Sequence, residues 1–302
     1  MQGKRIVLIN DQPGYGKVAL AGMPPILARM GYELMLLPTA IISNTLDYGR
    51  FAVRDMTDYM RECVKVWEEL KLDYEAACTG YIVSEAQAEF LREYLSDQKK
   101  THGIRVYVDP IMGDRGRLYN SVTEKNVESM RRLCAIADVI CPNMTEAQYL
   151  AGRFQGREDL TQGEMDELIE ALRQIGASNV VITSACIDGV HQVYGWEGES
   201  FSVPYEHIPV NYPGTGDLFA ALLVGRNLEG HPLKEAASYA ASMIRTFMME
   251  DLRVHSGYKG IPSEWYLERL GAEYGVHDPA DTAADAHDEN RAQLEFPQGG
   301  QG

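Results

Sequence analysis

Residues 211–225 read NYPGTGDLFAALLVG, and this stretch begins with small residues and continues as an apolar run that predicts a helix. Asp217 falls in the first turn of that helix. One interpretation is that an acidic residue there is stabilised by the positive end of the helix dipole. The other is that the amides of residues 214–216 hold an anion while Asp217 accepts a proton. The stretch alone leaves both interpretations open.

Strand-like and helix-like segments alternate along the chain before this helix, and this alternation indicates βαβ units. Apolar runs predict strands at 4–10, 32–38, 75–81, 105–110, 138–143 and 179–185, and an antiparallel pair at 191–196 and 200–205. Helical patterns are predicted at 16–30, 55–70, 84–100, 123–136, 145–148, 161–175 and 233–249. The alternation predicts an α/β fold of three layers, α/β/α, with a mostly parallel central sheet and helices on both faces.

The domain organisation follows from composition. No compositional break interrupts residues 1–258, which we predict to be one domain without a separate lid domain. We expect residues 259–277 to be a C-terminal extension. Residues 278–302 are acidic and polar with almost no core-forming side chains, and this composition predicts a disordered tail.

Charge and cysteine content exclude several classes of protein. The formal net charge of −16 argues against nucleic acid or an anionic membrane surface as the main partner. No stretch approaches the ~20 apolar residues of a membrane span, and no secretory apolar region is evident. The five cysteines lack metal-site spacing and predict reduced thiols in a cytoplasmic protein.

Polar side chains follow each predicted strand, where ligands of open parallel sheets bind. The segments are Asn10–Gly16, Ser43–Thr45, Thr79–Tyr81, Asp109–Asp114, Asn143–Glu146, Thr183–Ser184 and Gly214–Asp217. Asp109 is either a turn residue before Pro110 or a functional acid. The second interpretation arises because a carboxylate directly after an apolar strand is costly unless it is paired or near a metal. Glu146 is a first-turn acid or, with Asn143, part of a hydrated Mg²⁺ site. An anion cradle, a magnesium site and a base together indicate phosphoryl transfer.

These motifs resemble those of the pyridoxal kinases of the ribokinase-like superfamily over residues 4–250. The matching stretches are LIND and GYG near the start, SNTLDYG (43–49), TGY (79–81), DPIMGDRGRLY (109–119), ADVICPNMTEA (137–147), VVITS (180–184) and GTGDLFAALL (214–223). The GTGD motif is common to the superfamily, whereas the DPIMGD, PNMTEA, TGY and SN elements point more narrowly to vitamin B6 kinases. Sugar kinases of the superfamily usually carry an added β lid, for which residues 39–54 are too short.

The resemblance implies a fold, an activity and three groups of site residues. The activity is ATP- and Mg²⁺-dependent phosphorylation of the 5′-hydroxymethyl group of pyridoxal, pyridoxamine and pyridoxine by a cytoplasmic homodimer. The catalytic residues would be Asp217 as the base and Gly214, Thr215 and Gly216 as the anion hole. ATP and Mg²⁺ would be held by Asp109, Asp114, Tyr119, Asn143, Glu146, Thr183, Ser184 and Tyr212, with Asp109 and Glu146 as metal ligands. The vitamer would be bound by Asp11, Ser43, Asn44, Thr45, Tyr81 and Asp217.

Two departures from the family pattern concern the substrate. Many members have Ser at the position of Asp11, which would face the polar edge of the pyridine. The usual Thr of the SNHTGY motif is replaced by Leu46, and Thr45, one residue earlier, is the candidate substitute. An acid at position 11 favours a protonated ring nitrogen or an amine, which predicts activity on pyridoxamine as well as pyridoxal.

Three alternatives remain. Hydroxymethylpyrimidine kinases share the fold but typically carry Cys where this chain has Asp217. A dinucleotide-dependent oxidoreductase is suggested by Gly14-Tyr-Gly16-Lys-Val-Ala19, although no acid follows the second strand to hold a ribose. A non-catalytic binding protein on this scaffold is the third. We expect Phe247, Met248 and Met249 to fill the core.

Overall fold

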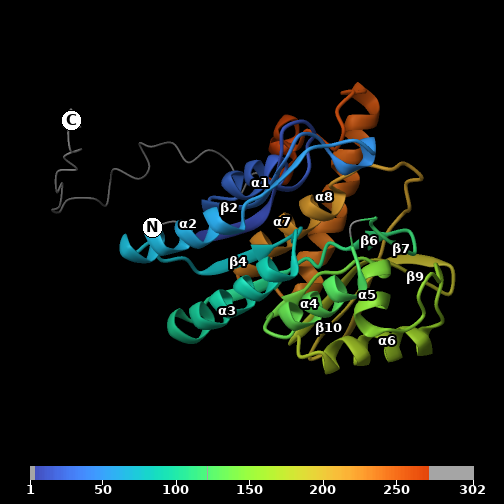
Figure 1. Ribbon diagram of the computed structural model, residues 1–302. Coiled ribbons are helices and arrows are strands. Elements are labelled where there is room, and N and C mark those ends of the chain that lie inside the picture. The colour runs from blue at the N-terminus through green and yellow to red at the C-terminus, as the bar shows by residue number, and fades with distance from the viewer. Residues whose placement is uncertain (1–3, 121, 272–302) are drawn as a thin grey trace, which may run out of the picture.

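The computed structural model describes residues 4–120 and 122–271. Nine strands form one sheet in the order β11-β10-β9-β8-β5-β4-β1-β2-β3, and β6 and β7 form a separate hairpin (Figure 1). The strands are β1 (Arg5–Pro13), β2 (Glu33–Ile42), β3 (Val53–Asp55), β4 (Ala76–Thr79), β5 (Arg105–Val108), β6 (Gly113–Asp114), β7 (Arg117–Leu118), β8 (Val139–Ile140), β9 (Asn179–Ile187), β10 (Val190–Glu197) and β11 (Glu199–Pro204). The helices are α1 (Met23–Arg29), α2 (Thr57–Glu69), α3 (Glu85–His102), α4 (Glu124–Cys134), α5 (Met144–Ala151), α6 (Gln162–Gln174), α7 (Thr215–Leu228) and α8 (Leu233–Val254).

The strands from β2 through β1, β4, β5 and β8 to β9 run parallel, whereas β3, β10 and β11 run antiparallel to their neighbours. The mostly parallel sheet and the antiparallel pair β10–β11 confirm the predicted fold. From β1 the chain passes to β2 on one side and returns to β4 on the other. The neighbouring ends of β1 and β4 are therefore a topological switch point, the place where open α/β sheets bind ligands.

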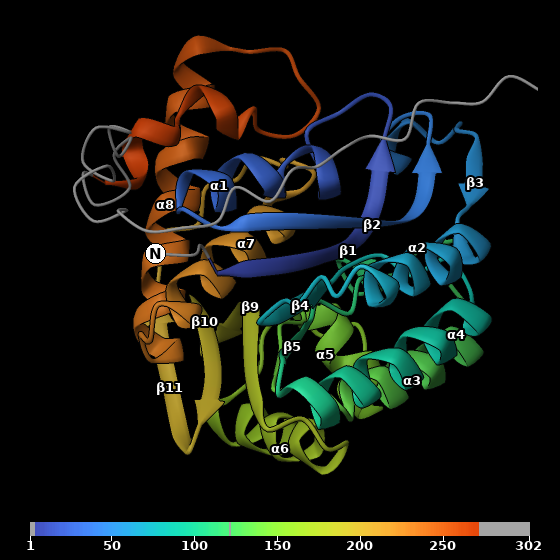
Figure 2. The same cartoon turned by 90° about the vertical axis from the view of Figure 1, so that its left-hand side faces the viewer.

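Helices cover both faces of the sheet, with α1, α7 and α8 on one side and α2, α3 and α4 on the other (Figure 2). The central strand β1 shows why. Ile6 and Leu8 pack into the core with α1, α7 and α8, whereas Val7 and Ile9 pack into the core with α2 to α6. Because a strand's side chains alternate between faces, a strand covered on both sides reads as a continuous apolar run.

The main differences from the expected elements have local causes. The helix expected from residue 16 begins only at Met23, since Pro24 and Pro25 lack N–H groups and fit only its first turn. The residues before it contain only a short 3-10 turn, Ala19–Ala21. Strand β3 and the β6–β7 hairpin were not predicted, because two or three residues carry no readable period. In the described chain, residues 39–54 join the main sheet and build no separate lid.

Residues 259–271 are the described part of the expected C-terminal extension, and they pack against the domain formed by the preceding residues. Ile261, Tyr266 and Leu270 are buried in the core that α1, α7 and α8 share. Gly260 forms a bridge with Lys17, whose ammonium pairs with Glu264. The expected tail, residues 278–302, lies outside the described residues. The predicted boundary at residue 258 remains a prediction.

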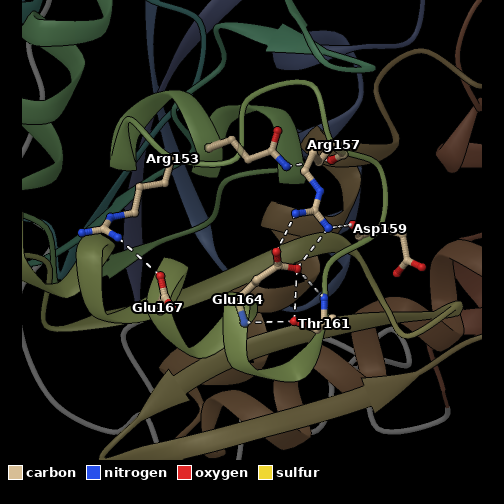
Figure 3. A network of polar contacts seen from close by, with 7 residues as sticks. Arg153, Arg157, Asp159, Thr161, Glu164 and Glu167 are labelled. Carbon is tan, nitrogen blue, oxygen red and sulfur yellow. Dashed lines mark hydrogen bonds and ion pairs between the residues drawn. The ribbon is translucent and has the colours of Figure 1, made fainter.

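A polar network fixes the connection between α5 and α6 (Figure 3). Thr161 caps α6 and forms a reciprocal capping box with Glu164. Arg157 donates two hydrogen bonds to Glu164, which holds the pKa of that carboxyl down at about 2. This connection reaches the β6–β7 hairpin, where an added Cβ on Gly116 would lie 3.2 Å from the Cα of Gly156. The network itself stays within this connection, which meets the hairpin only where Gly156 lies near Gly116.

We predict that Ile261→Ala lowers the free energy of unfolding by about 2–5 kcal/mol, because it removes buried methyl groups from a packed core. Chemical denaturation followed by circular dichroism measures the effect. Trp265→Ala, at an exposed position in the same segment, serves as the control and should change the free energy of unfolding little. Equal stability of Ile261→Ala and the wild type would show that residues 259–271 are not part of the domain core.

Candidate active site

The end of β1 is shaped by an irregularity in its pairing with β2. Asn10 lies opposite Pro38 and Gln12 lies opposite Ile41, so β2 contributes one more residue than β1 between these pairs. Such a bulge redirects the side chains beside it. Asn10 and Asp11 lie at this bulge, and both are buried.

Asp217 occupies the first turn of α7 and is only 7% exposed. One carboxylate oxygen accepts a hydrogen bond of 2.9 Å from Asn10 Nδ2, and the other accepts one of 2.9 Å from the backbone N–H of Ala19. Burial raises the pKa of Asp217, and these two hydrogen bonds oppose the rise. The side chain is thus held in one orientation by two separate segments.

Gly214 is the N-cap of α7 and has a φ of 82°. A Cβ at this position would lie 2.7 Å from Val18 Cγ1 and 3.0 Å from the carbonyl oxygen of Lys17. Both the left-handed backbone and the close approach of the Lys17–Val18 segment therefore require glycine. The N-terminus of α7 is consequently left with bare amides, as an anion cradle requires.

Two further buried acids are Asp109, which follows β5, and Glu146, which lies at the start of α5. Burial raises the pKa of Asp109, and the nearby charges of Glu146 and then Asp217 raise it further. Burial also raises the pKa of Glu146, although backbone hydrogen bonds oppose the rise. The three acids singled out in the sequence are therefore close enough to interact electrostatically.

Asn143 and Glu146 form a reciprocal capping box at the start of α5. The helix starts at Met144 with Asn143 as its cap, which corrects the expected start at Thr145. Glu146 accepts hydrogen bonds from the N–H groups of Asn143 at 2.8 Å and Met112 at 3.1 Å. Asn143 Nδ2 donates to the carbonyl oxygen of Gly113 at 2.8 Å. Asn143 thus ties α5 to the β6–β7 hairpin.

The hairpin brings two further predicted residues near this acid pair. Burial of the hydroxyl, and then the charges of Glu146 and Asp114, raise the pKa of Tyr119, although the residue as a whole is 38% exposed. The N–H of Gly116 donates to Thr145 Oγ1 at 2.8 Å, which fixes the hairpin on α5. Asp114 and Tyr119 are therefore within electrostatic reach of Glu146, and their membership of one shared site stays a prediction.

A cavity of about 220 Å³ lies beside the start of α7. Thr183 and Ser184 after β9 and Thr215 and Gly216 of the anion cradle line it together. Its other lining residues are Val193, Tyr205, Glu206, His207, Ile208, Val210, Phe219, Ala241, Ile244, Arg245 and Met248. The mixture of apolar walls and a few polar groups is typical of a small-molecule site.

Residues around this cavity differ in whether they line it, fill the core or are exposed. Tyr212 is not among the lining residues, and a hydrogen bond from its hydroxyl to Asp251 contributes to raising its pKa to about 12, after burial. Met248 lines the cavity and Met249 is exposed, so only Phe247 of the expected core-filling trio is fully buried.

The remaining predicted residues gather at the ends of β1, β2 and β4. Burial and then the charge of Asp217 raise the pKa of Asp11 to about 7. Tyr81 is buried with Ala40 and Ile42, and Leu46 packs against this cluster. Thr45 is also buried.

Ser43 and Asn44 use their side chains within their own loop. Ser43 Oγ accepts a hydrogen bond from the N–H of Ala52 at 2.9 Å, and Asn44 Nδ2 donates to the carbonyl oxygen of Arg50 at 3.0 Å. The structure therefore gives both residues a part in shaping the loop.

Gly14 and Gly16 do not form the strand–turn–helix arrangement of a dinucleotide fingerprint, because α1 begins several residues later, at Met23. A Cβ on Gly14 would lie 2.8 Å from the carbonyl oxygen of Ser43, and one on Gly16 would overlap the Thr45 side chain. These glycines let the chain pack closely against the 43–45 loop.

Within residues 4–120 and 122–271, no group of three or more His, Cys, Asp or Glu side chains could hold a metal ion. The helices in the same ranges include none with the length and apolarity needed to cross a membrane. All five cysteines are free thiols, as the sequence predicted.

Known proteins share both this sequence and this fold. The phosphomethylpyrimidine kinase family matches residues 29–261. A pyridoxal kinase of Arabidopsis thaliana is 32% identical, over 91% of this chain and 92% of its own length. The chain belongs to the pyridoxal kinases of this family.

Solved structures of the family agree with this assignment. A protein of Bacteroides thetaiotaomicron, described as a phosphomethylpyrimidine kinase and crystallised with pyridoxal, is 33% identical with a TM-score of 0.81, over 89% of this chain and 96% of that one. The pyridoxal kinase of Leishmania donovani in complex with ADP and ginkgotoxin is 25% identical with a TM-score of 0.72, over 88% and 95% of the two chains. The ribokinase-like fold is therefore shown.

Sequence reasoning missed two parts of the candidate site. Asn10 stood in the segment after the first strand but carried no predicted role, although it contacts Asp217 directly. The walls that α8 and residues 205–210 give to the cavity were also missed. Apolar residues that line a cavity carry the same periodic pattern as residues that fill a core.

We predict that Asn143→Ala lowers the free energy of unfolding by about 1 kcal/mol and also lowers kinase turnover about tenfold or more, because it removes both a helix cap and the tether to the hairpin. Thr161→Ala is the matched control, since it removes a similar cap at α6. Thr161→Ala should cost a similar amount of stability and leave turnover unchanged. Equal turnover in the two variants would refute a role of Asn143 in the site.

Proposed function

We propose that the protein transfers the terminal phosphoryl group of Mg²⁺-ATP to the 5′-hydroxymethyl group of B6 vitamers, with pyridoxal, pyridoxamine and pyridoxine as the substrate class. The observation that carries the proposal is the position of Asp217. The residues just before it, Thr215 and Gly216, line the cavity, while its own carboxylate points to Asn10 at the end of β1. The relatives named for pyridoxal kinase activity and the likeness to a chain crystallised with pyridoxal support the substrate class.

In the proposed step, Asp217 accepts the proton of the substrate hydroxyl. The hydroxyl oxygen forms a bond to the terminal phosphorus of ATP, and the bond from that phosphorus to the bridging oxygen breaks, so that ADP leaves with the electron pair. The raised pKa of Asp217 brings this carboxylate closer to the ideal for a general base near neutral pH. The amides of Gly214, Thr215 and Gly216 would hold the negative charge of the transferring group.

The cavity beside α7 would hold the nucleotide. Its polar groups at Thr183, Ser184 and Thr215 lie beside the anion cradle, and its apolar walls suit a base. The ADP complex of the Leishmania donovani pyridoxal kinase supports this part of the proposal. Tyr212 would act by shaping the loop, since its carbonyl oxygen accepts a hydrogen bond from Thr215 Oγ1 at 3.2 Å.

Asp109 and Glu146 fit a magnesium ion that arrives with the nucleotide. Both are buried carboxylates whose pKa values are raised, and no described Lys or Arg pairs with either. Mg²⁺ commonly binds through one or two carboxylates together with substrate phosphates, so a complete protein cage is not needed. When bound, the ion would neutralise phosphate charge, and Asp114 and Tyr119 would border the same region.

Asp11 and Tyr81 would receive the vitamer ring. Tyr81 offers an aromatic wall, and Thr45 and Leu46 come from the loop that follows β2. Asp11 would face a positively charged nitrogen of the substrate. The homodimeric state and the cytoplasmic location remain predictions.

A hydroxymethylpyrimidine is the second candidate substrate, because the family that matches this chain is described as phosphomethylpyrimidine kinase. Asp217 stands where hydroxymethylpyrimidine kinases typically have Cys, which favours the B6 vitamers.

We predict that the wild-type protein phosphorylates at least one B6 vitamer and that Asp217→Asn lowers turnover by roughly 10²–10⁴, the usual size of a general-base contribution. The measurement is ATP-dependent phosphorylation of pyridoxal, pyridoxamine, pyridoxine and hydroxymethylpyrimidine side by side, with and without added Mg²⁺. Nucleotide affinity should change little in the variant. Turnover of hydroxymethylpyrimidine alone would move the assignment to the second candidate, and an active Asp217→Asn would remove Asp217 as the base.

We also predict that the KM for pyridoxamine falls as pH rises through about 7. The pKa of Asp11 is raised to about 7, so below that pH Asp11 is neutral and above it the carboxylate can pair with the amine. Asp11→Ser should flatten this dependence and reduce the preference for pyridoxamine over pyridoxal. Pyridoxal measured over the same pH range is the control, and an unchanged profile in Asp11→Ser would refute the contact.

A further inference from the structure

One buried amide, that of Asn10, connects three residues of the proposed site. Its Nδ2 donates to Asp217 Oδ1 at 2.9 Å. Its Oδ1 accepts hydrogen bonds from the backbone N–H of Asp11 at 2.9 Å and from that of Tyr81 at 2.8 Å. The side chain is 2% exposed, so it has little water to replace any of these partners.

These contacts fix which way the amide faces. Backbone N–H groups can only donate, so the oxygen of Asn10 must face Asp11 and Tyr81. The NH₂ group is then directed to the Asp217 carboxylate, which can only accept when it is ionised. With the N–H of Ala19 on its other oxygen, Asp217 is held at both oxygens and cannot rotate without losing a bond.

Gly80 keeps the amide in this place. A Cβ on Gly80 would overlap the Nδ2, Cγ and Oδ1 atoms of Asn10. Gly80 does not have a positive φ, so it is needed here for space rather than for backbone conformation. The close approach of β4 to the amide is possible because β1 and β4 are neighbours at the switch point.

We propose that Asn10 is a positioning residue for phosphoryl transfer, which holds the Asp217 carboxylate in the orientation that accepts the substrate proton. The inference rests on the proposed function, in which Asp217 is the base. A purely structural role would need only the two bonds that Asn10 accepts. The bond that it donates instead favours the ionised form of Asp217, against the burial that raises its pKa.

The same amide also ties the base to the substrate side of the site. Asp11 and Tyr81, whose N–H groups it accepts, are the residues proposed to receive the vitamer ring. Because the oxygen and the nitrogen belong to one planar group, a shift of the ring-binding residues and a shift of the base are coupled. Orientation within a fraction of an ångström matters for such a transfer.

The test is a double-mutant cycle of Asn10→Leu, Gly80→Ala and the double variant, with pyridoxal, pyridoxamine and ATP as substrates. Leucine has a similar size and no hydrogen-bonding atoms, whereas Gly80→Ala displaces the amide without changing its chemistry. We expect kcat per folded protein to fall about 10- to 100-fold in each single variant, the size of a lost hydrogen bond to a charged group. The KM for ATP should stay within about twofold, because the cavity does not contain Asn10.

The double variant should be no slower than Asn10→Leu alone, since the effect of Gly80→Ala acts through the amide that Asn10→Leu has already removed. Gly163→Ala on α6 is the control for replacing a glycine, because a Cβ there meets no atom within 4 Å. It should leave kcat and both KM values unchanged. Thermal unfolding of each variant separates loss of fold from loss of turnover.

Near-normal kcat in folded Asn10→Leu would overturn the inference, and so would losses that simply add in the double variant. If Asn10→Leu does not fold, a normal kcat in Gly80→Ala overturns the inference instead. If neither variant folds, a normal kcat in the smaller change Asn10→Ser overturns it. An active Asp217→Asn removes the base assignment itself. An inactive Asp217→Asn with an unaffected Asn10→Leu removes only the role of Asn10.

Discussion

The burial of several carboxylates without a paired cation is the constraint on which this site depends. Asp11, Asp109, Glu146 and Asp217 are all buried, and none forms an ion pair with a described Lys or Arg. Burying a carboxylate costs free energy unless hydrogen bonds or a cation compensate it. Here the protein supplies hydrogen bonds to Asp217 and Glu146, and no described cation meets the remaining charge. Such uncompensated acids are typical of functional sites and are seldom kept for stability.

The fold meets this constraint by bringing backbone N–H groups to the acids. The N–H of Ala19 reaches Asp217 because Ala19 has a φ of 47°, an unusual conformation for a residue other than glycine. The short 3-10 turn that begins at Ala19 is possible because the two prolines delay α1 until Met23. The unusual backbone before α1 is thus part of the site, which agrees with the tendency of strained residues to lie where function needs them.

The sequence predicted the parts of the site that are local and left out the parts that arise from strand order. Asp109, Glu146 and Asp217 could be identified because each follows a strand or begins a helix, and the ends of parallel strands meet on one edge. Asn10 could not, because its role depends on β4 lying beside β1, and the sequence pattern does not say which strands are neighbours. The short strands β3, β6 and β7 carry too few residues for a period, although β6 contains Asp114 and Tyr119 directly follows β7.

The first turn of α7 divides the proposed site into two halves. Thr215 and Gly216 line the cavity on one side, whereas Asp217, the next residue, points to Asn10 and the end of β1 on the other. Consecutive residues of a helix are about 100° apart around its axis, so one turn can present amides to one ligand and a carboxylate to a second. A group that passes between the two ligands must then cross this turn. The space around Gly216 is open, whereas the close approach of Val18 leaves no room for a side chain at Gly214.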